Sequence, residues 1–389
     1  MFNSKKADIF YISPSSIPSK SANSIHVLLQ CEAFSKLGYK VKLYFRRSIK
    51  SKKQTKLYIK NDRGINLNDI ELKSIYSPVD LATSLFITLR ALPSLFIDKK
   101  NLIISRNLYT SYLISVIFRR KFFFETHQIE YGFRKILQRK ILQSNTAITI
   151  VISSKLSYLL KQHYKQNFKR MIVMPDAARS GIVPIESSKR RRSLEKLLKL
   201  SLIKYTSICG YFGHLYKGRG IELIINLAKN RKSSLFIICG GTLDDINKFK
   251  KENNLKNLIF LGYKSHEFVI NIMRMVDILL MPYQSKVSIG VKGHDTSRWM
   301  SPMKMFEYLA SGVPLISSNL PVLKEVLKHK VNSLLVNPSN TSEWLEAINS
   351  LEKDQKLAND ISRNAHKIYK EEYTWTKRAE KLLKIYYEE

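Results

Sequence analysis

Apolar and polar positions along this chain follow two periods, one typical of buried strands and one typical of helices. An apolar run at 8–13 is followed by a polar loop at 14–23, a helical pattern at 24–37 and a second strand pattern at 39–45. Strand, loop, helix and strand in this order predict a βαβ unit, the start of a parallel sheet. The segment 48–69 is polar and basic, and we expect it to be mobile. Four more strands are expected, at 101–105, 122–124, 147–153 and 170–174.

A second alternating series begins at Tyr205. Strand patterns at 206–212, 235–239, 258–261 and 278–281 alternate with helical patterns at 220–230, 244–253 and 266–275. The chain is therefore predicted to be an α/β protein with two Rossmann-like parallel-sheet domains that face a central cleft. We place the first domain at 1–178, a basic linker at 179–204, the second domain at 205–370 and a C-terminal helix at 371–389. This last helix, opened by Trp375 as a packing anchor, is expected to pack back toward the first domain.

Composition narrows the class of protein. The chain has 389 residues and three cysteines, which lie far apart in apolar runs and predict buried thiols in a reducing compartment. The most apolar segment, Leu81 to Ile97, is interrupted by Arg90 and Pro93 and is too short to span a bilayer. The N-terminus has no signal-peptide pattern. We therefore expect a cytoplasmic protein.

The net charge of +35 is uneven, with 31 − 9 = +22 in residues 1–175 and 35 − 22 = +13 in the remainder. A basic first half suggests an anionic partner such as a membrane surface, a charged glycan or nucleic acid. The alternative is a lysine-rich protein that places lysine at any solvated position, because the lysines are scattered and form no single tract.

The stretch from Thr296 to Asn319 carries the most informative chemistry. Ser301 and Pro302 predict the start of a helix, which Gly312 ends. The free amides of such a start favour an anion such as a diphosphate. Glu307 lies more than a turn further along, where its carboxylate could accept hydrogen bonds from a ribose diol. Together these features suggest a nucleotide site, although a capped core helix with a surface glutamate is the simpler interpretation of the stretch alone.

Two further loops carry charged residues. The loop GYFGHLYKGRGIELI holds His214, Lys217 and Arg219 between glycines, which let a backbone approach a phosphate, although it lacks P-loop spacing and a solvated basic loop is the usual case. FFFETH places Glu125 and His127 just past a strand end, where parallel sheets bind ligands. The loop at 14–23 is not a G-x-G-x-x-G fingerprint.

Taken together, these features resemble the retaining family 4 glycosyltransferases with the GT-B fold (glycosyl transferases group 1), across essentially the whole chain. The segments that carry the resemblance are SANSIHV, FFFETH, GYFGHLYKGRG, CGG, IFLGY, ILLMPY, SPMKMFEYLASGVPLISSNLPVLKEV and TWTKRAEKLL. The resemblance implies transfer of a sugar from a UDP- or GDP-linked donor to a lipid-linked or glycan acceptor, with retention of configuration, in cell-surface glycan or glycolipid assembly. It implies no metal and no other cofactor, and no nucleic acid partner.

The resemblance also implies roles for particular residues. Glu307 would hold the ribose, and the turn of Ser301, Pro302, Met303 and Lys304 the diphosphate. His127, Lys217 and Arg219 would be catalytic, with His127 reaching the donor sugar and the two cations opposing charge on the leaving diphosphate. The remaining donor contacts would come from Gly213, His214, Gly262, Tyr263 and Ser24. The sequence departs from the family at Trp299, where a glutamate is common, and at His214, where an arginine is usual.

Two other classes of function remain open at this stage. A nucleotide-sugar epimerase can share the fold, but it would need carboxylates from both domains, and the first offers chiefly Glu125 and Glu130. A non-enzymatic basic protein that binds membrane or nucleic acid would leave the Glu307 helix unexplained. Charge and apolar content in the first domain further suggest peripheral contact with an anionic membrane, at the inner face of the plasma membrane.

Overall fold

The computed structural model describes residues 8–77, 83–97, 101–288 and 295–388. Contacts along the chain group it into two compact units, residues 1–176 with 375–389, and residues 177–374. Each unit holds one parallel sheet, and the predicted α/β class with two Rossmann-like sheets is confirmed. None of the described helices is long and apolar enough to cross a membrane.

The first unit is built on a seven-stranded sheet with the order β3-β2-β1-β4-β5-β6-β7, in which every neighbouring pair is parallel. The order reverses between β1 and β4, the place where open parallel sheets bind ligands at their carboxyl edge. The strands are β1 (Ile9–Ile17), β2 (Val41–Arg47), β3 (Ile70–Tyr76), β4 (Leu102–Ser105), β5 (Phe122–Thr126), β6 (Ala147–Val151) and β7 (Met171–Val173).

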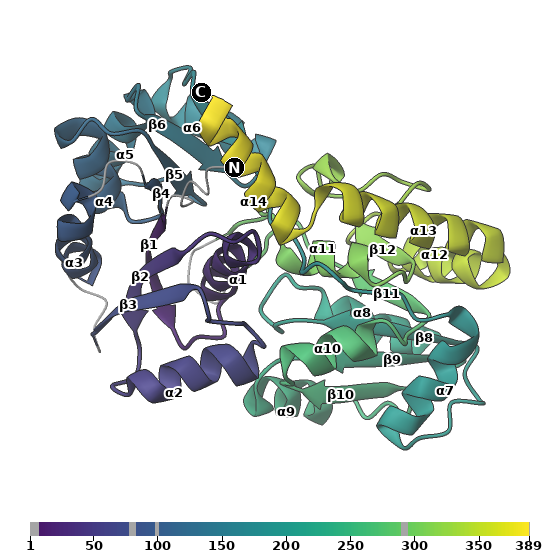
Figure 1. Ribbon diagram of the computed structural model, residues 1–389. Coiled ribbons are helices and arrows are strands. Elements are labelled where there is room, and N and C mark those ends of the chain that lie inside the picture. Colours follow the sequence, from purple (N-terminus) through teal and green to yellow (C-terminus); the bar gives the residue numbers. More distant parts are fainter. Residues whose placement is uncertain (1–7, 78–82, 98–100, 289–294, 389) are drawn as a thin grey trace, which may run out of the picture. The chain divides into compact units, whose positions relative to one another are not determined.

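Helices cover both faces of this sheet, with α1 on one side of the strands and α3 and α4 on the other (Figure 1). The C-terminal helix α14 packs against α1. The helices are α1 (Ala22–Lys36), α2 (Lys52–Leu57), η1 (Tyr58–Asp62), α3 (Thr83–Ile97), α4 (Leu108–Tyr112), η2 (Leu113–Ile117), α5 (Gly132–Gln143), α6 (Ser154–Tyr164) and α14 (Trp375–Glu388).

Two expectations for the first unit need correction. The first strand does not end at 13 but continues to Ile17, because the chain bulges after Ile12 and then pairs with the end of β2. The polar segment 48–69 contains α2 and η1, which its polar composition conceals, and it buries Ile59 of η1 and Ile65 of the loop that follows. Leu81, the start of the expected apolar segment, lies outside the described residues, and the helix there begins at Thr83.

The second unit has a six-stranded parallel sheet with the order β10-β9-β8-β11-β12-β13. The four strands predicted here agree with β8, β9, β10 and β11 to within one or two residues, because each is a short, largely apolar run that a glycine or polar turn follows. The strands are β8 (Ser207–Phe212), β9 (Ser234–Cys239), β10 (Leu258–Gly262), β11 (Ile278–Met281), β12 (Leu315–Ser318) and β13 (Leu334–Val336).

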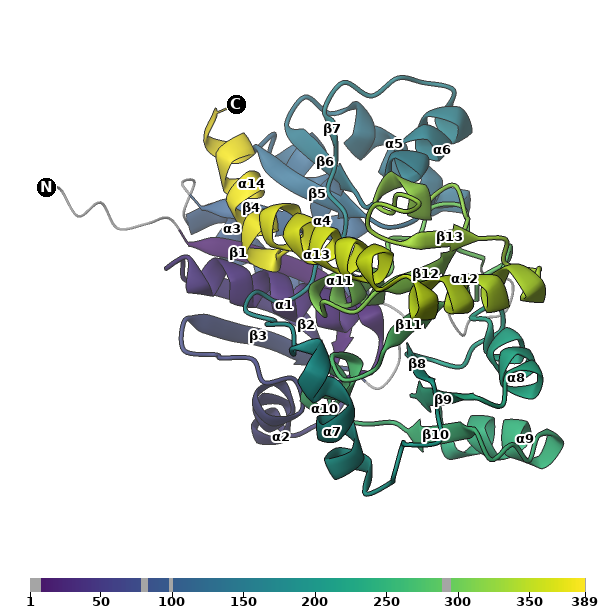
Figure 2. The same cartoon turned by 90° about the vertical axis from the view of Figure 1, so that its right-hand side faces the viewer.

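Two apolar cores lie on the two faces of this second sheet. One contains residues of α7, α10 and α11, the other contains residues of α8, α9 and α12, and α13 contributes to both. Figure 2 shows α8 and α9 on one side of β8, β9 and β10, and α7 and α10 on the other. The helices are α7 (Ser187–Leu198), α8 (Ile221–Asn230), α9 (Leu243–Glu252), α10 (His266–Met273), α11 (Met303–Ala310), η3 (Leu323–Glu325), α12 (Thr341–Lys353) and α13 (Gln355–Glu372).

The segment 179–204, expected as a linker, contributes α7 to the second unit. Leu194 of this helix is fully buried in the core that also holds α10 and α11. The basic run is partly used for structure, because Arg190 donates to the carbonyl of Gly312 at 2.6 Å and Arg191 to that of Tyr205 at 2.7 Å. Two of the four cations in this run therefore hold backbone carbonyls.

Candidate functional site

Glycines join the carboxyl ends of three neighbouring strands in the second unit. The amide of Gly213, after β8, donates to the carbonyl of Cys239 at 2.9 Å, and that of Gly240, after β9, donates to the carbonyl of Gly262 at 2.9 Å. A Cβ on Gly240 would lie 2.0 Å from the carbonyl oxygen of Gly213, and the φ of Gly240 is +132°. Only glycine fits there, so backbone groups of the three strand ends lie in contact at this edge of the sheet.

Two cations from different elements meet on one aromatic ring beside these glycines. The guanidinium of Arg219 lies 5.0 Å from the ring centre of Tyr283, and the ammonium of Lys304 lies 4.7 Å from the same centre and 3.9 Å from that of Tyr211. Arg219 also donates from Nη1 to the hydroxyl of Tyr283 at 2.7 Å. Aromatic faces attract cations, which explains how two positive groups are held so close to one ring.

Carboxylates do not neutralise this pair. Within the described ranges, neither Arg219 nor Lys304 forms an ion pair, and the buried Nε of Arg219 has no hydrogen-bond partner. Burial first, and then the charge of Arg219, hold the pKa of Lys304 well below its usual value, while Glu307 acts in the opposite sense. An anion bound here would relieve the repulsion and supply the missing acceptor.

The start of α11 differs from the prediction by one residue. Pro302 occupies the cap position with extended backbone, no side chain caps the helix, and Met303 is the first helical residue. The predicted cap by Ser301 is therefore wrong, although Ser301 is buried at this start. The first amide bonded in this turn is that of Met305, to the carbonyl of Pro302 at 2.9 Å. In the described part of the chain, the amides of Met303 and Lys304 thus keep no acceptor, as an anion site requires.

Glu307 lies one turn further along α11 and is bonded to a residue that sequence reasoning missed. Its Oε1 lies 2.8 Å from Nε2 of His266, the first residue of α10. His266 follows directly on the turn that contains Gly262, with φ of +68°, and Tyr263, which is 40% exposed. The ribose and base contacts expected from the sequence therefore lie on adjoining elements of one unit.

The other predicted residues of this unit lie around the same loop. The imidazole of His214 stacks on the ring of Tyr216, with ring centres 4.8 Å apart and planes 3° from parallel. Lys217 is exposed, and its carbonyl accepts from the amide of Ser288 at 3.1 Å. Trp299 is partly buried, with its amide bonded to the carbonyl of Thr296.

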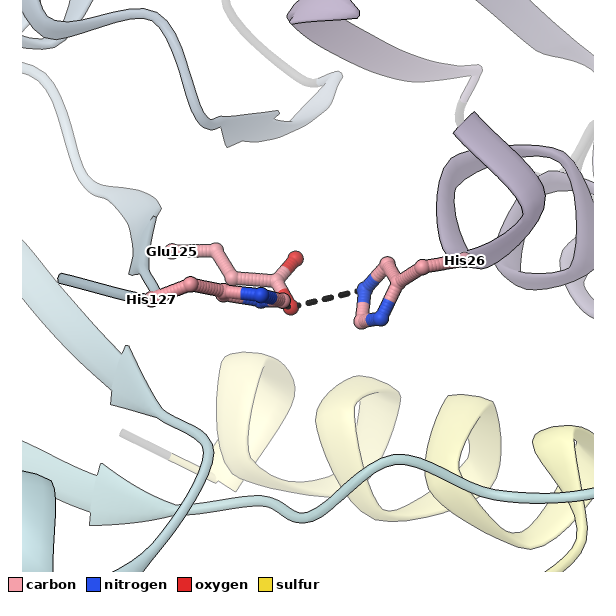
Figure 3. A group of neighbouring side chains, drawn as sticks. All are labelled: His26, Glu125 and His127. Atoms are coloured by element: carbon pink, nitrogen blue, oxygen red, sulfur yellow. Dashed lines mark hydrogen bonds and ion pairs between the residues drawn. The ribbon is translucent and has the colours of Figure 1, made fainter. Parts of the chain in front are cut away.

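The first unit contains a separate cluster around the buried carboxylate of Glu125. Oε1 of Glu125 lies 2.8 Å from Nε2 of His26, 3.1 Å from Nε2 of His127 and 2.8 Å from Nη2 of Arg378, and Oε2 accepts from the hydroxyl of Tyr11 at 2.8 Å. Figure 3 shows the His26 ring, from α1, directed at the carboxylate of Glu125, from β5. Residues far apart in the sequence thus converge on one buried acid.

The protonation of this cluster follows from its contacts. Burial raises the pKa of Glu125, but the charges of His26 and Arg378 and the hydrogen bond from His127 outweigh burial, and its pKa lies well below the ordinary value. Burial and then Arg106 lower the pKa of His127 to about 4. Nη2 of Arg106 lies 3.2 Å from Nδ1 of His127, and because arginine only donates, we assign the ring proton to Nε2, which donates to Glu125.

His26, Glu125 and His127 offer three potential ligand atoms within 4.8 Å of one another, of the types that a metal ion takes. Two contacts oppose a metal there. A nitrogen that carries a proton, as Nε2 of His127 does beside Arg106, cannot donate a lone pair. Arg378 already occupies Oε1 of Glu125, and its charge would repel a cation. The cluster therefore fits a buried ion-pair network better than a metal centre.

Sequence reasoning found only part of the first unit's cluster. It selected His127, both of whose ring nitrogens are engaged within the cluster, and Ser24, whose buried hydroxyl bonds that of Ser21 at 2.7 Å at the start of α1. It missed Arg378, which lies within the quoted segment TWTKRAEKLL. It also missed Asp176, whose Oδ1 lies 2.7 Å from Nδ1 of His26. Arg378 is one of several basic residues in α14, and nothing local in the sequence distinguishes this buried arginine from the exposed lysines of the same helix.

Residues 199–368 match the family model "Glycosyl transferases group 1". The chain is 27% identical over 184 residues to the putative glycosyltransferase YtcC of Bacillus subtilis, across 45% of this chain and 44% of that protein. It is 24% identical over 188 residues to the O-antigen biosynthesis glycosyltransferase WclY of Escherichia coli, across 46% of each. These alignments span less than half the length of the curated relatives.

Solved structures share the fold over the whole length. HepE of Anabaena, crystallised in complex with UDP and glucose, superposes with a TM-score of 0.72 at 14% sequence identity, covering 99% of this chain and 100% of that one. At this identity the likeness establishes the fold alone. The expectation of a GT-B arrangement of two Rossmann-like units is therefore confirmed as a fold.

Proposed function

We propose that the protein is a glycosyltransferase that moves a sugar from a nucleoside-diphosphate donor to an acceptor hydroxyl with retention of configuration. The observation that carries this proposal is the unneutralised pair of Arg219 and Lys304 on the ring of Tyr283. The match of residues 199–368 to a glycosyltransferase family model supports the reaction class. Solved proteins of the same fold bind UDP or UDP-glucose, which supports a nucleotide-linked donor.

Each part of the site has a task in such a reaction. The amides of Met303 and Lys304 and the side chain of Arg219 receive the diphosphate, while Glu307 accepts hydrogen bonds from the ribose. Negative charge on the diphosphate grows as the bond to the sugar breaks, so cations fixed in advance stabilise the transition state more than the ground state. These cations act where other enzymes use a metal ion, and Lys217 adds charge from the exposed side of the loop.

The acceptor is proposed to be a glycan or a lipid-linked glycan at the cell surface, made on the cytoplasmic side. Support comes from relatives named for O-antigen and teichuronic acid biosynthesis. This acceptor class also agrees with a solved neighbour of the same fold, an S. aureus TarM mutant crystallised in complex with Fondaparinux, alpha-GlcNAc-glycerol and UDP. Retention of configuration follows from the resemblance to retaining enzymes, and a front-face mechanism needs no carboxylate nucleophile.

The proposal includes peripheral contact of the first unit with an anionic membrane, because a lipid-linked acceptor would lie in that membrane. The start of α5 exposes Phe133 and Ile136, at 66% and 56%, and the same helix carries Arg134, Arg139 and Lys140 with no acid. Apolar side chains beside cations suit the boundary of an anionic bilayer. Sedimentation with vesicles rich in phosphatidylglycerol, compared with neutral vesicles, tests this contact.

The epimerase alternative finds little support in the acids of the first unit. Glu125 is buried and surrounded by nitrogen donors, and Glu130 is bonded to Arg134 at 2.6 and 2.8 Å. Neither carboxylate is placed to exchange a proton with a sugar.

Two experiments test the proposed function. Titration calorimetry with UDP and GDP should detect binding to the wild type and none, or at least tenfold weaker binding, to Arg219→Met. A panel of nucleotide-sugars, screened for release of free nucleotide with candidate glycan acceptors, then identifies the donor. Equal nucleotide affinity of wild type and Arg219→Met, or release that requires no acceptor and yields an isomerised sugar, would contradict a transferase at this site.

A further inference from the structure

One contact in the second unit joins two helices, α10 and α11, that lie far apart in the sequence. The side chains of His266 and Glu307 lie 2.8 Å apart and are only 16% and 14% exposed, although 41 residues separate them in the chain. Only one oxygen of Glu307 is used, because across the described residues nothing else hydrogen-bonds this carboxylate. The Glu307 carboxylate is thus held in one orientation through Oε1, and Oε2 is left for another donor.

The backbone around His266 is fixed on both sides. The carbonyl of Gly262 accepts from the amide of Gly240 at 2.9 Å, which ties the end of β10 to that of β9. The hydroxyl of Ser265 accepts from the amide of Phe268 at 3.4 Å and caps α10. His266 therefore extends from a tethered turn and a capped helix, so its ring position is determined before any ligand binds.

From this contact we propose that His266 is a positioning residue of the nucleoside half of the site. This inference rests on the proposed function. His266 holds Oε1 of Glu307 and thereby presents Oε2 to the hydroxyls of a ribose. It also links the Gly262–Tyr263 turn, next to which a base would lie, to the acid that would hold the sugar of the same nucleoside.

The physical effect is preorganisation. A carboxylate that is already immobilised loses less conformational freedom when a ribose binds than one that rotates freely. Loss of the His266 contact should therefore weaken binding of a ribonucleotide by about tenfold. It should leave a nucleotide without ribose hydroxyls unaffected, because that ligand makes no use of Glu307.

The test uses whichever of UDP and GDP the wild type binds, together with its 2′,3′-dideoxy form, in titration calorimetry. The variants are His266→Ala, His266→Gln, whose amide can still donate to Glu307, and Glu267→Ala, an exposed neighbour on the same turn of α10 that serves as control. Thermal unfolding of each variant checks that the fold is retained.

The expected result is about tenfold weaker binding of the ribonucleotide to His266→Ala, recovery to within about threefold in His266→Gln, and no change in Glu267→Ala. Adding His266→Ala to Glu307→Gln should then have no further effect, because His266 acts through the acid. The inference is overturned if His266→Ala binds as well as or better than wild type, or loses affinity equally for both ligands. A wild type that binds neither UDP nor GDP would overturn the proposed function together with this inference. Failure of the inference alone is recognised because the wild type then still binds the nucleotide.

Discussion

Replacement of Arg378 by methionine should destabilise the first unit strongly, and by an amount that depends on pH. The guanidinium is 3% exposed, lies 2.8 Å from Oε1 of Glu125, donates to the carbonyl of Pro175 at 3.0 Å and contacts Gln30. Removing one partner of a buried pair costs about 3–5 kcal/mol. Glu125 keeps three other polar contacts, so we expect about 3 kcal/mol at neutral pH.

The sign of the pH dependence follows from the depressed pKa of Glu125. A carboxyl group with a folded pKa below its unfolded value of about 4.3 adds stability above that value, and this stability is lost as pH falls through the folded pKa. In Arg378→Met, burial still raises the pKa of Glu125 while one opposing charge is gone. The stability difference between variant and wild type should therefore shrink as pH falls through the pKa of Glu125 in the variant, and it should level off only below the lower wild-type pKa. About 1 kcal/mol from the lost hydrogen bonds should then remain.

Urea unfolding at pH 7 and at successively lower pH, down to the onset of acid unfolding, measures the stability difference, and hydrogen exchange in peptides of β5 and α14 locates it in the first unit. Lys384→Met is the matched control on the same helix, because Lys384 is 70% exposed and its pair with Glu388 spans 3.8 Å. This control should cost less than about 0.5 kcal/mol. Equal losses in the two variants at pH 7, or a loss in Arg378→Met that does not change with pH, would refute the assignment of Arg378 as a countercharge of Glu125.

Three further predictions concern the other features of the chain. Gly240→Ala places a Cβ 2.0 Å from the Gly213 carbonyl oxygen. It should lower the free energy of unfolding, measured by thermal denaturation, by about 3 kcal/mol, and calorimetry should detect no nucleotide binding. Full nucleotide affinity would show that the strand ends can separate freely. Lys304→Met should remove proton uptake on binding of UDP or GDP, measured in buffers of different ionisation enthalpy. Because the pKa of Lys304 is lowered, wild-type affinity should also fall as pH rises through it, and a pH-independent affinity would argue against this. Phe133→Ser with Ile136→Ser should reduce sedimentation with anionic vesicles at least tenfold without altering nucleotide affinity, and unchanged sedimentation would exclude α5 as the contact.

Local patterns were most informative where a stretch of chain has one environment along its whole length. Strands β8, β9 and β11 of the second unit are fully buried, and their apolar runs located them to within one or two residues. The same patterns failed where a short apolar element lies inside a polar segment. At 48–69, two buried isoleucines among lysines gave no period long enough to indicate α2 and η1.

The candidate site residues also divide into those that a local pattern indicates and those that it does not. Glu307, Lys304 and Arg219 could be selected because each lies beside a helix start or a glycine turn whose chemistry is local. Their partners could not be selected in this way. Tyr283 follows an ordinary apolar strand, and His266 is an unremarkable residue at the start of a helix, until the sheet order brings β8, β9, β10 and β11 to the same edge.

The sequence by itself determined the α/β class, the two sheets, the glycine turns and the charged residues that border them, because these depend on periodicity and on contacts between near neighbours in the chain. Tertiary structure decided which charges are compensated and which are not. Glu125 is surrounded by donors from β1, α1, the loop after β5 and α14, whereas Arg219 and Lys304 share an aromatic ring with no acid bonded to either in the described chain. Such compensation depends on distances across a fold, which no local pattern encodes.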